Sequence, residues 1–172
     1  MRKWIFPISV LLVVPLVAFA AQHSKVSSQD GTWLIAAHQT NLAEIKSGDL
    51  AAESGHTEAV RKAGRMLTQD HSKLDAKLGP VAKQLGVKLP AKPNAEQRDE
   101  MKQFKSLSGL KFDKVWTHTE ADGHVKAIEM TEREIHDGSL PKVKHLAESA
   151  LPVLKKHLQT LHQTANFING DH

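Results

Sequence analysis

The sequence predicts an all-α protein, an antiparallel four-helix bundle with one short extra helix in the connection between the second and third long helices. Three observations support this fold class. Apolar residues recur every three or four positions through most of residues 31–168, which is the spacing of one helix face. No segment alternates apolar and polar residues as a strand does. Short loops join the predicted long helices, and short connections favour neighbours that run in opposite directions.

The first long helix is predicted from Asp30, which we expect to act as its N-cap, to about Ser54. Gly55 provides the expected end. The residues that precede this helix, 21–30, are polar and rich in serine, so we expect them to form a flexible leader. One face of the helix carries small and apolar residues at helical spacing, and Glu44 lies on that face.

The second long helix is predicted from Thr57 to Leu85 and carries the clearest apolar stripe of the chain. Gly79-Pro80 should bend it, because proline removes a backbone donor and its ring clashes with the preceding turn. Residues 87–94 contain two prolines and predict a loop. Asn94 is then the expected N-cap of a short helix that ends at Leu107.

The third long helix is predicted over residues 111–136, where Asp137-Gly138 stops it. Ser139 is the expected N-cap of the fourth, which extends to about Phe167. Pro152 should kink this helix or divide it after Ala150. We find no internal repeat, so the expected bundle forms one domain over residues 31–168.

Residues 1–20 have the features of a signal peptide. Arg2 and Lys3 precede an uncharged apolar run, and Ala18-Phe19-Ala20 provides the small residues that signal peptidase recognises. Cleavage near Ala20/Ala21 would place the mature chain in the periplasm or outer envelope, where it could associate with the envelope or the membrane. The alternative is an uncleaved transmembrane anchor, against which two prolines interrupt the run.

The composition excludes several classes of function. The chain has no cysteine, which excludes disulfides, thiol catalysis, iron–sulfur clusters and covalent c-type haem. The net charge of +4 falls to +2 once Arg2 and Lys3 leave with the signal peptide, which is too little to predict nucleic-acid binding. No phosphate-binding loop or hydrolase motif occurs, so no catalytic residue is assigned. Glu120 and Glu134 are expected among the solvated charges of the third long helix.

Four ionisable residues lie near the middle of the predicted buried faces, one on each long helix: Glu44, His71, His124 and His157. A buried ionisable group without a partner costs several kcal/mol, so these groups must satisfy one another or bind something. Three imidazoles and a carboxylate suit a tetrahedral site for one divalent metal ion such as zinc. Asp70 and Asp122 lie close in sequence to two of the histidines and are the expected outer partners of the ligands.

Three functions remain open at this stage. The first is a non-enzymatic envelope protein that binds a divalent metal ion. The second is a structural or stress-related interaction module in which the buried groups form only a hydrogen-bond network. The third is a metal- or haem-dependent redox protein, with haem held between His71 and His157. Di-iron chemistry is excluded, because it needs two Glu-x-x-His motifs and the one match, Glu53 to His56, spans Gly55.

Several motifs of the chain resemble those of a bacterial family called domain of unknown function 4142. They cover about residues 31–168 and are Glu44 with Gly48, Met66-Leu67-Thr68-Gln69-Asp70-His71-Ser72, Gly86-Val87-Lys88-Leu89-Pro90, Leu107-Ser108-Gly109 before Phe112-Asp113, His124, and Leu151-Pro152 ahead of His157-Leu158. The resemblance implies a ferritin-like four-helix bundle in the periplasm or envelope. It implies no established activity, and its recurring polar positions coincide with the four candidate ligands.

Overall fold

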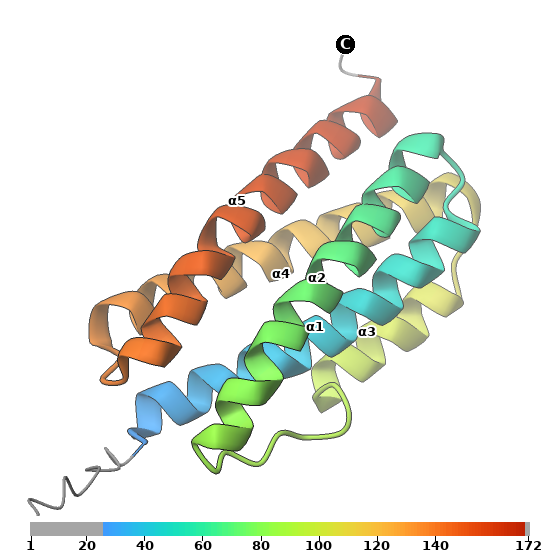
Figure 1. Cartoon of the computed structure of the whole chain (residues 1–172). Coiled ribbons are helices and arrows are strands. Elements are labelled where there is room, and N and C mark those ends of the chain that lie inside the picture. The colour runs from blue at the N-terminus through green and yellow to red at the C-terminus, as the bar shows by residue number, and fades with distance from the viewer. Residues whose placement is uncertain (1–25, 171–172) are drawn as a thin grey trace, which may run out of the picture.

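The computed structural model describes residues 26–170 (Figure 1). Within that range the chain forms five helices and no strand: α1 (Ser28–Ser54), α2 (Glu58–Gln84), α3 (Ala95–Lys105), α4 (Gly109–Asp137) and α5 (Pro141–Asn169). The prediction of an all-α fold with one short helix between the second and third long ones is confirmed. The predicted signal peptide lies outside the described residues. None of these five helices combines the length and the apolarity that a membrane span requires.

The four long helices associate in two pairs. α1 packs mainly along α2, and α4 packs mainly along α5 (Figure 1). The pairs meet where α1 contacts α4 and α2 contacts α5, and α3 packs against α1 and α4. The buried apolar residues form two separate clusters, one around Leu67 and Trp116 and the other around Leu34 and Val143. The candidate ligands of α2, α4 and α5 belong to neither cluster.

Two glycines bring the backbones of α1 and α2 into close contact. A Cβ atom on Gly48 would lie 2.6 Å from the carbonyl oxygen of Gly64, and a Cβ on Gly64 would lie 2.5 Å from that of Gly48. Neither position therefore admits a side chain without a shift of the backbone. This contact fixes the packing of α1 against α2. Gly64 precedes the candidate ligand His71 by seven residues.

Buried aspartates connect the helix pairs at both ends. Asp30 of α1 accepts hydrogen bonds from the backbone N–H groups of Ser139 and Leu140, each at 3.1 Å, where α5 begins. Asp113 of α4 accepts hydrogen bonds from the N–H groups of His56 and Thr57, each at 2.8 Å, where α2 begins. Each pair therefore supplies the acceptor for the free N–H groups of the other pair.

Two tryptophans repeat this reciprocal arrangement one turn further along. The indole N–H of Trp33 on α1 donates to Thr131 on α4 at 3.4 Å, and that of Trp116 on α4 donates to Ser47 on α1 at 2.8 Å. Each tryptophan lies three residues after the aspartate of its own helix. The pattern Asp-x-x-Trp thus occurs once in each pair, although the sequence predicted no repeat.

Two predicted N-caps are wrong, and the aspartate contacts explain both. Ser27 caps α1, with Asp30 as the partner in its capping box, so residues 28–30 belong to the helix rather than to the expected leader. Ser139 does not cap α5, because its hydroxyl donates to Asp30 instead. The predicted caps Thr57 and Asn94 are confirmed.

The long helices continue through their internal prolines. Pro80 lies within α2, and Pro152 lies within α5, which the structure does not divide after Ala150. One proline removes a single backbone donor, and the turns of α5 on both sides of Pro152 remain packed through buried residues such as Ala147 and Leu154.

Candidate metal centre

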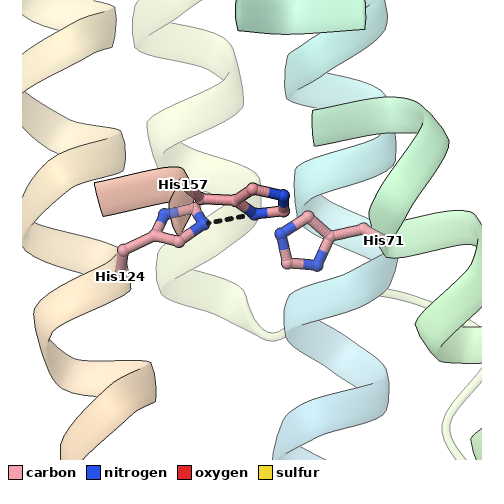
Figure 2. A group of neighbouring side chains, drawn as sticks. All are labelled: His71, His124 and His157. Atoms are coloured by element: carbon pink, nitrogen blue, oxygen red, sulfur yellow. Dashed lines mark hydrogen bonds between the residues drawn. The ribbon is translucent and has the colours of Figure 1, made fainter. Parts of the chain in front are cut away.

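Three histidines from three helices meet in the interior. His71 of α2, His124 of α4 and His157 of α5 are at most 1 % exposed. One ring nitrogen from each lies within 4.8 Å of the corresponding nitrogens of the other two. Figure 2 shows the three rings turned toward one another, with His124 Nε2 3.2 Å from His157 Nδ1. The sequence predicted that these three residues come together, and the structure places them side by side.

The outer partners of the rings define where their protons lie. The Nδ1–H of His71 donates to the side-chain oxygen of Asn41 at 2.9 Å, and the Nδ1–H of His124 donates to the backbone oxygen of Glu120 at 2.8 Å. The Nε2–H of His157 donates to the carboxylate of Asp70 at 3.3 Å. Since a neutral imidazole carries one N–H, the unprotonated nitrogens are His71 Nε2, His124 Nε2 and His157 Nδ1.

These unprotonated nitrogens are the ones that face the centre of the group. His71 Nε2 is buried and has no hydrogen-bond partner. With the protons in the positions just described, the 3.2 Å contact between His124 and His157 brings two lone pairs together without a hydrogen between them. The centre is therefore a place where a positive charge, either a proton or a metal ion, would be stabilised.

Burial disfavours the proton as that positive charge. It lowers the pKa of His71 well below its ordinary value, and the two neighbouring histidines lower it further. Burial likewise lowers the pKa of His124 to about 4. The pKa of His157 is lowered by burial too, although the carboxylate of Asp70 opposes this. At neutral pH the three rings are therefore uncharged, which is the state that ligates metal ions.

The two predicted outer partners differ in position. Asp70 is half-buried and reaches across to His157 of α5 rather than to its sequence neighbour His71. Asp122 is exposed and pairs with His118 at 3.0 Å, so its predicted contact with His124 is wrong. A helix turns about 200° in two residues, which directs Asp122 and His124 to different faces.

Glu44 lies on the other side of His124 and does not join the three-histidine group. One of its carboxylate oxygens is 3.8 Å from His124 Nδ1, and its ligand group consists of Glu44, Glu120 and His124, whose candidate atoms lie within 4.8 Å of one another. His124 therefore belongs to two neighbouring groups. The structure divides the four predicted ligands between them.

Glu120 is the residue of this site that the sequence reasoning missed. It was expected in solvent together with Glu134, but both side chains are buried, at 6 % and 0 % exposure. Its position four residues before His124, on the same helix face, is the signal that would have identified it. Burial raises the pKa of Glu120. It also raises the pKa of Glu44, and the negative charge of Glu120 adds to that increase.

Comparison with known proteins identifies a family and no further relative. A family model described as Domain of unknown function (DUF4142) matches residues 16–164. No curated protein and no solved structure matches the chain. The resemblance that the sequence motifs indicated is confirmed, and the chain belongs to the DUF4142 family.

Proposed function

We propose that this protein is an exported, non-enzymatic four-helix-bundle protein that binds one divalent transition-metal ion through His71, His124 and His157. The proposed fold is the antiparallel, ferritin-like bundle, supported by the two helix pairs and their short connections. The proposed location, the periplasm or outer envelope, rests on the signal-peptide features of residues 1–20.

The observation that carries the metal proposal is the direction of the three unprotonated nitrogens. Zinc ligated at 2.0–2.1 Å in a tetrahedron separates its nitrogen ligands by about 3.3 Å. The distance of 3.2 Å between His124 Nε2 and His157 Nδ1 corresponds to one edge of such a tetrahedron. Because one ring nitrogen of His71 lies within 4.8 Å of a ring nitrogen of each of the other two, a short movement of His71 would complete the set of three ligands.

Ligand type and outer partners both support a transition metal. Imidazole nitrogen suits zinc, copper, nickel and iron. Each ring also donates its outer N–H to an oxygen, of Asn41, Glu120 or Asp70, which is the usual support of metal-bound histidine. Three protein ligands leave the fourth tetrahedral position to water.

The second candidate is a hydrogen-bond network without metal. The 3.2 Å contact between His124 and His157 favours it, because one added proton would convert this contact into a hydrogen bond. This network, however, leaves His71 Nε2 buried without a hydrogen-bond partner. For the haem alternative, the space beside His71 is a cavity of about 40 Å³, which is too small for a macrocycle.

The test is metal-dependent stability of protein purified without a polyhistidine tag. At a zinc concentration one hundred times the dissociation constant, the wild type should gain about 2.7 kcal/mol in free energy of unfolding. His71→Gln and His157→Gln keep a polar side chain but remove a ligand, so zinc should not stabilise them. In chelator, both variants should have the same free energy of unfolding as the wild type.

His145→Gln is the matched control, because His145 is exposed and should leave both measurements unchanged. If His71→Gln is equally destabilised with zinc and with chelator, the hydrogen-bond network is the correct function of the cluster and the metal proposal fails.

A further inference from the structure

A second polar site lies next to the histidines, in a cavity between α1, α3 and α4. Its volume is about 250 Å³. Four carboxylates line it, those of Glu44, Glu96, Glu100 and Glu120. Lys126 is the one basic residue in this lining, and it pairs with Glu96 at 3.8 Å. The lining therefore has four carboxyl groups and a single basic side chain.

The two carboxylates deepest in this cavity are incompletely satisfied. Glu44 and Glu120 are each 6 % exposed, and Glu44 Oε2 has no hydrogen-bond partner. Glu120 accepts a hydrogen bond from the hydroxyl of Ser47, which in turn accepts one from the indole of Trp116 at 2.8 Å. Glu120 is thus held in position, and Glu44 hydrogen-bonds to it. The other oxygen of Glu44, Oε2, stays buried beside this pair without a partner.

We propose that this cavity holds a second cation, a hard divalent ion such as Mn²⁺, Mg²⁺ or Ca²⁺, bound by Glu44 and Glu120 and separate from the three-histidine centre. Candidate ligand atoms of the two glutamates lie within 4.8 Å of each other, a separation that one ion bound at 2.0–2.6 Å to each can span. Two carboxylates neutralise its charge inside the protein.

The donor set explains why this ion differs from the one at the histidines. His124 Nδ1, which lies 3.8 Å from Glu44, carries a proton that it donates to the backbone oxygen of Glu120, so it offers no lone pair here. The remaining donors are oxygens, which hard cations prefer. At roughly 30 Å³ for each water, the cavity of about 250 Å³ accommodates an ion that keeps several of its waters.

The second site requires no ligand from the three-histidine centre, so the two proposals can fail separately. Mn²⁺ binding to the purified untagged protein tests the second site. Binding is measured as the loss of the electron paramagnetic resonance signal of free Mn²⁺. The wild type and His71→Gln should each bind one Mn²⁺ per chain with similar affinity, although His71→Gln has lost its zinc. Glu44→Gln and Glu120→Gln should each bind Mn²⁺ at least tenfold more weakly.

Two further glutamate variants serve as controls for loss of charge alone. Glu100→Gln removes a carboxylate that lines the same cavity but lies outside the ligand group, and we expect a change of less than threefold. Glu129→Gln removes an exposed carboxylate of α4, the helix that carries Glu120, and should change nothing. Circular dichroism checks that each variant is folded, and either Glu44→Gln or Glu120→Gln is sufficient for the test.

Three results would overturn the second site. Absence of Mn²⁺ binding in the wild type is the first. Equal affinities of the wild type, Glu44→Gln and Glu120→Gln would show that Mn²⁺ binds elsewhere. Loss of Mn²⁺ in His71→Gln would show that one centre takes both ions, which contradicts the proposed separation but leaves the three-histidine centre intact.

Discussion

Asp30 and Glu44 are buried carboxylates on the same helix, and their surroundings are opposite. Asp30 is fully buried and accepts hydrogen bonds from Ser27, Ser139 and Leu140. Burial alone would raise its pKa, but these hydrogen bonds outweigh burial and hold the pKa well below its usual value. Glu44 is almost as buried, yet one of its oxygens has no partner, and its pKa is raised by burial and by Glu120.

The difference separates a structural group from a candidate binding group. The protein supplies every partner that Asp30 needs, so its charge stabilises the native state. It leaves Glu44 and His71 each with a buried atom that nothing satisfies, which costs stability unless a ligand supplies the missing interaction. Buried polar residues in this fold can therefore be sorted by whether their partners are already present.

The largest effect should follow from removal of Asp30. Asp30→Ala leaves the N–H groups of Ser139 and Leu140 without their acceptor. Hydrogen bonds to a charged group contribute about 1.5–3 kcal/mol each, so we expect a loss of about 3–5 kcal/mol in the free energy of unfolding in urea. Asp99→Ala, in an exposed pair with Lys102, is the control and should change it by less than about 0.5 kcal/mol. A loss below about 1 kcal/mol for Asp30→Ala would remove the contrast with Glu44.

An intermediate effect should appear in the pH dependence of stability. The pKa of His124 is about 4 in the folded state and about 6.5 in the unfolded chain. Below pH 6.5 the unfolded state therefore binds more protons than the folded state, and the protein loses stability as the pH decreases. Between pH 7 and pH 5, in chelator, the wild type should lose about 2 kcal/mol more than His124→Gln. Parallel curves for the two proteins would show that His124 is not a buried neutral base.

The smallest effect should come from Glu44→Gln. A raised pKa means that folded Glu44 retains its proton above the pH at which the unfolded chain releases it. The wild type therefore loses stability relative to the variant as pH rises through the folded pKa. In chelator we expect the two proteins to be most alike at pH 5 and Glu44→Gln to be the more stable of the two at pH 8, measured by urea unfolding. If the variant is instead destabilised by more than 2 kcal/mol at pH 8, Glu44 is a structural group like Asp30.

The fold was largely predictable because its signals are local. Thr57 and Asn94 cap helices as predicted, since an N-cap bonds to a backbone group two or three residues away. Asp30 was misassigned because its partners at Ser139 and Leu140 lie more than one hundred residues further along. Ser27-x-x-Asp30 does match a capping box, so the correct start of α1 was readable even though the long-range contact was not.

The candidate site was only partly predictable. Periodicity indicates whether a side chain is buried better than it indicates which neighbouring side chain it faces. It identified that His71, His124 and His157 lie on buried faces at a similar level, and the structure brings them together. It could not show that Glu44 faces Glu120 across the α1–α4 contact, since side-chain direction between helices depends on how the helices are rotated against each other. Periodicity alone therefore combined two neighbouring groups into one.

The exchange of aspartates between the helix pairs has a consequence for how the chain folds. The α1–α2 pair contains the N–H groups of His56 and Thr57 but not their acceptor, which is Asp113 of the other pair. The α4–α5 pair depends in the same way on Asp30. Neither helix pair by itself contains the acceptor for the N–H groups of the turn that connects its two helices. The two helix pairs gain these bonds only when they dock, so we expect the whole domain to fold in a single cooperative transition rather than in two successive ones.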